Sequence, residues 1–163
     1  MASQVENTGG VYFVPAFNGL FAPWWRDDAR GIVIGITRYT TKAHIARAVL
    51  ESMCFQVKDV VDSMQKDYGN DKKDGVLRVD GDLSAMPVIR PSDIETTARG
   101  AAFAAGLAAG IWKEDFIFDT AEQMKKATTF RPIMTEEVRK KKVECWNKAV
   151  NRSFDLADLS FEL

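Results

Sequence analysis

Several classes of function are excluded by what this sequence lacks. It has one histidine and two cysteines in 163 residues, and the cysteines do not have the spacing of a metal-binding motif. It contains no Gly-Lys-Ser/Thr phosphate loop, no His-Glu-x-x-His and no Gly-x-Ser-x-Gly. The chain therefore carries none of the short signatures of P-loop enzymes, zinc peptidases or serine hydrolases.

There is also no surplus of charge of either sign. The 22 Lys and Arg residues balance the 23 Asp and Glu residues, whereas a nucleic-acid-binding domain usually has a basic face. The longest run low in polar residues, 100–112, is too short to span a bilayer, and residues 1–7 lack the apolar core of a signal peptide. We expect no nucleic-acid partner, no membrane segment and, with so few cysteines, a cytoplasmic location.

What is present is an ordinary globular composition, with 46% hydrophobic and 28% charged residues. Short β-branched runs alternate with segments of helical periodicity, which predicts an α/β fold. The predicted strands are 11–14, 31–36, 76–79 and 87–89, and the predicted helices are 41–67, 96–111 and 136–151.

The spacing of apolar residues also predicts which side chains are buried. Segment 31–36 is apolar on both faces and is typical of a fully buried strand. Apolar residues recur every three or four positions along helix 41–67 and predict one buried face. The residues of that face are Ile45, Ala46, Val49, Leu50, Met53, Val57, Val60, Val61 and Met64. In helix 136–151 the predicted buried residues are Val138, Cys145, Trp146 and Val150.

Three groups of polar residues have a structural rather than a catalytic interpretation. His44 lies in the first turn of a predicted helix and has no evident partner for acid–base chemistry. Asp27 and Asp28 are adjacent in a charged loop, where carboxylates are usually solvated. The basic run 139–142 follows Glu136 and Glu137 and is typical of a solvated helix face.

Two further features point to a ligand or an interface. The turn Asp80-Gly81-Asp82 follows the predicted strand 76–79, and a glycine there lets the backbone approach a nucleotide closely, although such turns are also common structural features. The helix that follows Glu95 is rich in Gly and Ala. Small side chains suit either close packing or a moving interface between domains.

The residues from Gly9 to Gly31 closely resemble the C-terminal half of the glycerol kinases, a branch of the FGGY carbohydrate kinase family, and plant members most of all. Residues 31–51 are similar to a signature of the whole family. In it, Gly31-x-Val33-x-Gly35-Ile36 is followed by His44-Ile45-x-x-Ala48-Val49-Leu50-Glu51. The turn 79–81 and the helix after Glu95 resemble that family's adenosine and interdomain motifs.

The resemblance implies the C-terminal half of an actin-like, ribonuclease-H-like kinase fold, present here in incomplete form. It implies a polar tail at 1–9, an FGGY C-terminal domain at 10–112 and a C-terminal helical extension at 113–163. Members bind Mg-ATP and glycerol and transfer the γ-phosphoryl group to a glycerol hydroxyl. Their general base and phosphate-binding hairpins lie upstream of the region matched here. Asp80, Gly81 and Asp82 are the nucleotide-binding residues that the resemblance assigns to this chain.

The chain departs from the family pattern in three places. Asp82 replaces the second glycine of the adenosine turn, and its carboxylate would repel a phosphate. The segment 82–86 is shortened and lacks a family helix; five residues cannot supply the crossover of about a dozen that parallel neighbouring strands need. Arg99 stands where the family has an apolar residue, so its guanidinium must find a partner or solvent.

Three functional hypotheses follow. The first is a glycerol kinase fragment that is inactive alone. The second is a non-catalytic module that forms a homo-oligomer or associates with a full-length kinase through apolar surface. The third is a residual nucleotide-binding domain, which the altered turn disfavours.

Overall fold

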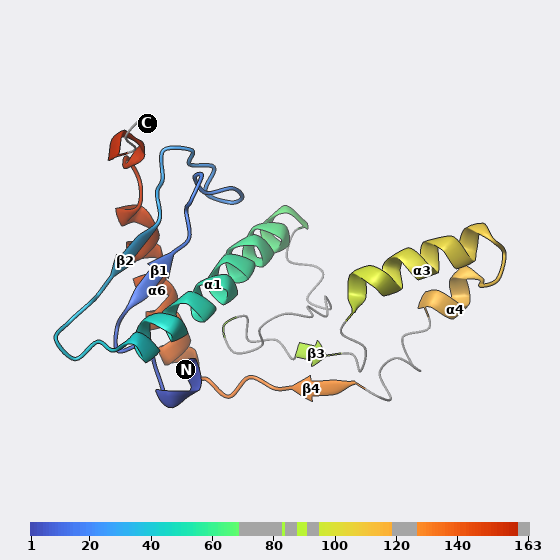
Figure 1. Cartoon of the computed structure of the whole chain (residues 1–163), viewed down its shortest axis with the longest axis horizontal. Helices are drawn as coiled ribbons and strands as arrows, with labels where there is room; N and C mark the ends of the chain where they lie inside the picture. The colour runs from blue at the N-terminus through green and yellow to red at the C-terminus, as the bar shows by residue number, and fades with distance from the viewer. Residues whose placement is uncertain (69–82, 84–87, 91–94, 119–126, 160–163) are drawn as a thin grey trace. The chain divides into compact units, whose positions relative to one another are not determined.

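The computed structural model describes residues 1–68, 83, 88–90, 95–118 and 127–159, which fall into two compact units (Figure 1). The first unit contains residues 1–68, 83 and 133–159, and the second contains residues 88–90, 95–118 and 127–132. The predicted strand 76–79 lies outside the described residues. The domain limits implied by the resemblance stay a prediction.

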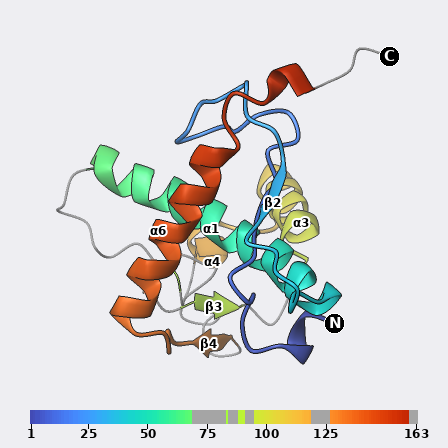
Figure 2. The same cartoon turned by 90° about the vertical axis from the view of Figure 1, so that its left-hand side faces the viewer.

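The first unit packs two long helices beside a pair of short strands. Strands β1 and β2 are antiparallel, with Tyr12 opposite Ile34 and Val14 opposite Ile32. Figure 2 shows helix α6 running across α1. The elements are η1 (Ala2–Gln4), β1 (Tyr12–Val14), β2 (Ile32–Ile34), α1 (Lys42–Tyr68), α6 (Glu136–Arg152) and η2 (Ala157–Leu159).

Helix α1 is long because nothing in its sequence interrupts it. Its 27 residues include no glycine or proline, the two residues that most disfavour a helix interior. Ion pairs one turn apart join Arg47 to Glu51 at 3.1 Å and Lys58 to Asp62 at 2.7 Å. The helix ends at Tyr68, one residue beyond the predicted end.

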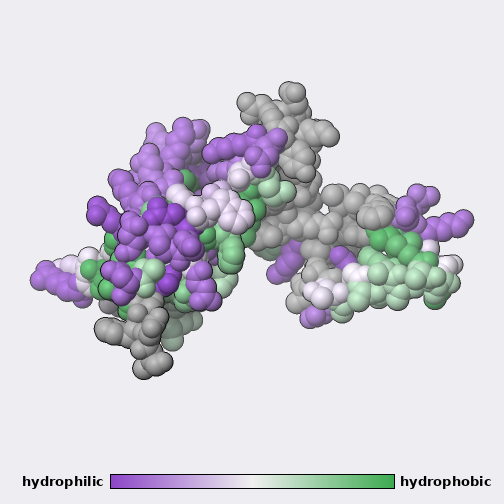
Figure 3. All heavy atoms as spheres, turned by 90° about the horizontal axis from the view of Figure 1, so that it is seen from above, coloured by the Kyte–Doolittle hydropathy of each residue, from purple (hydrophilic) through white to green (hydrophobic). Residues whose placement is uncertain are grey.

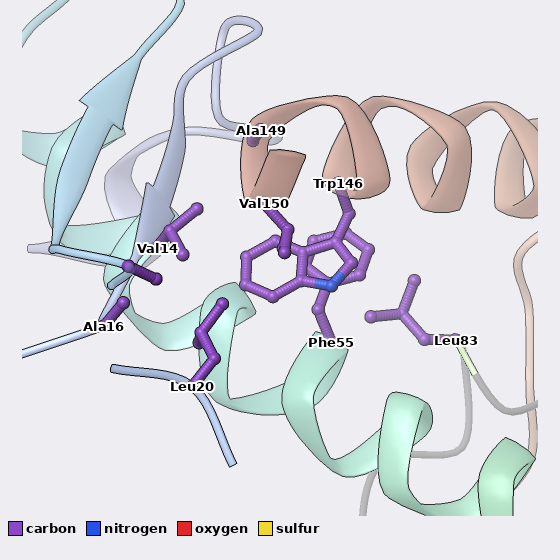
Figure 4. Close-up of a cluster of buried hydrophobic side chains, with 9 residues drawn as sticks. Val14, Ala16, Leu20, Phe55, Leu83, Trp146, Ala149 and Val150 are labelled. Atoms are coloured by element: carbon purple, nitrogen blue, oxygen red, sulfur yellow. The ribbon is translucent and has the colours of Figure 1, made fainter. Parts of the chain in front are cut away.

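The core of the first unit is centred on two stacked aromatic rings. Phe55 of α1 and Trp146 of α6 lie with ring centroids 5.0 Å apart and planes 8° apart, and neither is more than 2% exposed. Figure 4 shows these rings with Val14 on one side and Leu83 on the other. Burial of Trp146, predicted from the sequence, is confirmed, whereas Val138 of the same prediction is 49% exposed.

The buried face of α1 agrees with the prediction only in part: Val61 is 7% exposed, as predicted, but most of the predicted residues are not buried. Ala48, Ser52 and Phe55 are its best-covered side chains, at 2% exposure each. By contrast, Leu50 is 57% and Met53 59% exposed. The predicted residues that are exposed are Ile45, Leu50, Met53, Val60 and Met64. The helix has apolar side chains on more than one face, and periodicity could not tell which face the rest of the first unit covers.

Strand β2 is also less buried than predicted. Val33 is 40% and Ile34 37% exposed. Within the described residues β2 pairs with β1 alone, so one edge of the strand has no described neighbour, and the exposed Val33 and Ile34 point to opposite faces. The prediction of a strand within 31–36 is therefore confirmed, whereas the prediction that this strand is fully buried is wrong.

Two glycines bring the chain together at the ends of this strand pair. Gly10 precedes β1 with φ of 84°, and Gly35 follows β2 with φ of 86°. A Cβ atom on Gly35 would lie 2.1 Å from the carbonyl oxygen of Gly10, whereas a Cβ atom on Gly10 would meet nothing within 4 Å. Only a residue without a side chain fits at position 35.

The second unit combines a strand pair with a helix of small residues. Strand β3 pairs antiparallel with β4, with Val88 opposite Phe130. The elements are β3 (Val88–Arg90), α3 (Thr96–Ala108), α4 (Glu114–Phe118) and β4 (Thr128–Phe130). Strand β3 was predicted and β4 was not. The described partner of β3 is β4, a strand that follows it in the chain.

Helix α3 ends three residues before its predicted limit, because the chain turns back at Gly110 with φ of 69°. Trp112 then packs against the helix. A Cβ atom on Gly106 would lie 2.1 Å from Cε3 of the indole, and Phe103 meets the same ring edge-on with centroids 5.6 Å apart. Gly106 is thus the position where the indole contacts the helix.

Candidate functional site

The predicted nucleotide-binding residues Asp80, Gly81 and Asp82 lie outside the described residues. Their role stays a prediction. The Gly/Ala helix assigned to the interdomain connection is described as α3, and it presents its small apolar side chains to solvent. Figure 3 shows this helix as a mostly hydrophobic surface.

Arg99, the residue that departs from the family pattern in α3, lies over an aromatic ring. Its guanidinium carbon is 5.8 Å from the ring centroid of Phe103, and the side chain is only partly exposed. A cation over a ring face is stabilised by the ring quadrupole. The guanidinium thus finds a partner, as its charge required.

The first unit contains a cleft of about 430 Å³ between the loop that follows β1 and the two long helices. The loop contributes Phe17, Phe21 and Trp24, α1 contributes Asp59, and α6 contributes Trp146. This volume lies in the range of small-molecule sites, roughly 300–1,000 Å³. Among the described lining residues, Asp59 is the one ionisable side chain.

Asp59 is held by two indole groups. Trp24 Nε1–H donates to Oδ2 of Asp59 at 2.9 Å, and Trp146 Nε1–H donates to the same oxygen at 2.8 Å. Burial raises the pKa of the Asp59 carboxyl, and the two indole hydrogen bonds oppose that rise by stabilising the carboxylate. Within the described residues Asp59 forms no ion pair. The neighbouring Lys58 binds both carboxylate oxygens of Asp62, and its charge also opposes the rise in the pKa of Asp59.

A second polar cluster ties the aromatic loop to the residues that follow α6. Arg26 pairs with Asp28 and also with Asp155, at 2.9 Å from its Nη2 to Oδ1 of Asp155. Its guanidinium carbon lies 4.2 Å from the ring centroid of Phe154, and Asp28 accepts a 2.6 Å hydrogen bond from the backbone N–H of Asp155. The solvated loop predicted for Asp28 is therefore wrong, while Asp27 is exposed as predicted.

This cluster predicts a loss of stability in acid. The Arg26 guanidinium holds the pKa of the Asp28 carboxyl well below its usual range. Because the folded pKa is depressed, the stabilisation is complete above the unfolded value of about 4 and is lost as pH falls toward the folded value. We expect Asp28→Asn to lower the melting temperature at neutral pH, with the difference from wild type shrinking below about pH 4.

Thermal melts followed by circular dichroism across that pH range would measure this difference. Asp27→Asn is the matched control, since Asp27 is exposed and its carboxylate is not part of the cluster. A constant difference between Asp28→Asn and wild type down to about pH 2 would show that the ion pair does not account for the effect of Asp28.

His44 has a structural role, as the sequence analysis expected. Its Nδ1 accepts the backbone N–H of Thr41 at 3.1 Å and lies 2.9 Å from the Thr41 hydroxyl. A side chain three residues into a helix that accepts the N-cap N–H satisfies one of the unpaired donors there. Part of the basic run also differs from a solvated face, because Lys142 reaches Glu51 of α1 at 2.9 Å.

No cluster of three or more His, Cys, Asp or Glu side chains could hold a metal ion in the part of the chain that the structure covers. In the same part, no helix has both the length and the apolarity to cross a membrane.

Comparison with known proteins identifies the class of this protein. Residues 1–109 match the family model of the FGGY family of carbohydrate kinases, C-terminal domain. The chain belongs to this family. Similar proteins within the family include glycerol kinases. The chain is 63% identical, over 98% of its length, to the glycerol kinase of Arabidopsis thaliana. It is 46% identical, over 97% of its length, to a probable glycerol kinase of Dictyostelium discoideum. The chain spans about a third of the length of these relatives, 34% and 30%.

Solved structures confirm the fold class. The glycerol kinase of Plasmodium falciparum, crystallised with ADP, matches 93% of this chain with a TM-score of 0.76 and 37% identity. A gluconate kinase from Lactobacillus acidophilus matches 98% with a TM-score of 0.65 at 22% identity, which supports the fold alone. The chain covers 32% and 35% of these structures. The predicted actin-like kinase fold in its partial, C-terminal form is therefore correct.

The Asp59 cleft was not predicted from the sequence. Its two indole donors lie 35 residues before and 87 residues after the carboxylate. No local motif joins residues so far apart. The one local signal was an acidic residue beside Lys58 in a stretch of α1 rich in apolar residues, a pattern that alone has many explanations.

Proposed function

We propose that this chain acts as the C-terminal domain of a glycerol kinase and does not phosphorylate glycerol by itself. The observation that carries the proposal is the 63% identity over 98% of the chain to a glycerol kinase of which it spans only 34%. The substrates of the complete enzyme are then glycerol and Mg-ATP, and the reaction transfers the γ-phosphoryl group of ATP to a glycerol hydroxyl. The compartment is the cytoplasm.

The reaction itself explains why one domain is insufficient. Phosphoryl transfer depends on holding the acceptor hydroxyl, the γ-phosphate and the metal ion in line, and on neutralising their charge. The resemblance places the residues that bind glycerol and the phosphates upstream of the region matched here. This chain would contribute the adenosine side of the site, through Asp80, Gly81 and Asp82.

The exposed face of α1 favours a second function, a non-catalytic module that associates with another kinase chain or with itself. Leu50 and Met53 are more than half exposed, and Met64 is 49% exposed. Clustered apolar side chains on a surface usually mark an interface. In a complete kinase the remaining two thirds of the protein could cover this face; in the module, a second chain covers it.

A glycerol-dependent assay of the purified chain tests the first proposal, with the full-length Arabidopsis relative as positive control. We expect no glycerol 3-phosphate above background from the chain and turnover from the control. Turnover by the chain alone would overturn the proposal. Light scattering on the same sample separates the two functions, because a chain that stays monomeric and does not bind the full-length relative contradicts the module.

Calorimetric titration with Mg-ADP tests the predicted adenosine turn. Asp82→Gly restores the family pattern and removes a carboxylate from the expected phosphate position, so we expect tighter binding by the variant than by the wild type. Asp74→Gly is the matched control, since it makes the same substitution in the charged segment 71–74, outside the predicted turn. Equal affinities for all three proteins would contradict the assignment of the turn.

A further inference from the structure

We propose that the cleft beside Asp59 binds a small organic cation, an alkylammonium whose charged group contacts Asp59 and whose apolar chain contacts the aromatic side chains of the loop after β1. The described residues of this cleft are not those that the resemblance assigns to the nucleotide. The site does not depend on kinase activity.

The carboxylate of Asp59 has no described cation paired with it. Asp59 is the one ionisable side chain among the described residues that line the cleft, and it forms no ion pair within the described part of the chain. Lys58, the residue before Asp59, binds both oxygens of Asp62, at 2.9 and 2.7 Å. A partly buried carboxylate without a cation is costly, and a bound cation would compensate it.

The indoles contact only one of the two carboxylate oxygens of Asp59. Trp24 and Trp146 both donate to Oδ2 of Asp59, and among the described residues no donor contacts Oδ1. Oδ1 is therefore the acceptor available to a ligand. The indoles also fix the orientation of the carboxylate, so a ligand would meet a preorganised acceptor.

Aromatic side chains line the cleft near Asp59. Phe17 is 71% and Phe21 76% exposed, and both line the cleft together with Trp24. Aromatic faces attract cations and also cover an alkyl chain. A carboxylate with several aromatic rings around it favours an ammonium group over an anion, and over a polyol that carries no charge.

The experiment is an NMR titration of the ¹⁵N-labelled chain with n-butylammonium, following the indole N–H signals of Trp24 and Trp146. Work at about pH 8 keeps the carboxyl ionised, well above its ordinary pKa of about 4. n-Butanol is the neutral ligand control, because it has the same chain length and no charge. We expect saturable shifts of both indole signals with the ammonium and binding roughly 10- to 100-fold weaker with the alcohol.

Two variants test whether the charge of Asp59 accounts for binding of the ammonium group. Asp59→Asn keeps a carbonyl oxygen for the indoles and removes the charge, and we expect a loss of affinity in the same range of roughly 10- to 100-fold. Asp67→Asn is the matched control: Asp67 is exposed near the end of α1 and is not among the described residues that line the cleft, so this variant should bind as the wild type does. Equal affinity of Asp59→Asn and wild type would overturn the proposal. If Asp59→Asn does not fold, equal affinity of the wild type for butanol and butylammonium has the same consequence.

A lysine side chain carries the same ammonium group on a polypeptide. Nα-acetyl-lysine methylamide is therefore titrated beside n-butylammonium. Binding of the free amine supports a small-molecule site. Binding of the lysine derivative without any binding of the amine would overturn the proposal and assign the cleft to a protein partner.

Discussion

Replacement of Trp146 by alanine is expected to lower the unfolding free energy of the first unit by about 3–5 kcal/mol, the usual cost of removing a large aromatic side chain from a core. Trp146 is 1% exposed and stacks on Phe55. Its loss leaves a cavity between α1 and α6 and also removes one of the two donors to Asp59. Because domains of this size are stable by only about 5–15 kcal/mol, the variant should lose a large share of its stability and unfold at a clearly lower urea concentration.

Urea unfolding followed by circular dichroism measures this effect without depending on tryptophan fluorescence. Trp25→Ala is the matched control, since Trp25 is 72% exposed, and it should change stability by less than about 1 kcal/mol. Trp146→Phe retains a ring against Phe55 but not the N–H, so it should fall between the two. A Trp146→Ala variant within about 1 kcal/mol of wild type would contradict the central position of this ring in the core.

The sequence predicted elements better than it predicted their surroundings. The limits of α1 followed from apolar periodicity and from the lack of glycine and proline, which are local properties. The buried face of α1 depends on which other segments reach it, and no window of sequence contains that information. Leu50 and Met53 extend the apolar pattern as well as Phe55 does, yet only Phe55 meets a ring from α6.

The same distinction applies to the candidate sites. The family was identified from contiguous motifs between Gly9 and Glu51, which a single sequence displays directly. The Asp59 cleft and the Arg26 cluster join residues from distant segments, and Arg26 lies 129 residues from Asp155. Asp28 was interpreted as solvated because it lies beside Asp27 in a charged loop and the sequence shows no evident partner for either carboxylate. The structure adds two distant contacts: the ring of Phe154 lies against Arg26, and the backbone N–H of Asp155 donates to Asp28.

Replacement of Gly35 by alanine is expected to destabilise the first unit more than the same replacement at Gly10, although both residues have nearly the same φ, 86° and 84°. An alanine at either position pays about 1–2 kcal/mol for the left-handed conformation. At Gly35 the new Cβ would also lie 2.1 Å from the carbonyl oxygen of Gly10. That obstacle is backbone, which cannot rotate away, so the strand ends must move apart.

Comparison of the two variants isolates the cost of the close contact, because the conformational cost is common to both. We expect Gly10→Ala to lower the unfolding free energy by about 1–2 kcal/mol and Gly35→Ala to lower it by a further ~1–3 kcal/mol, the usual cost of overpacking. Urea unfolding of both variants beside wild type gives the difference. Equal destabilisation would mean that the contact between the chain before β1 and the chain after β2 relaxes freely. A larger loss at Gly35 would show that this contact holds the two strands in register, which the two-stranded pairing by itself does not ensure.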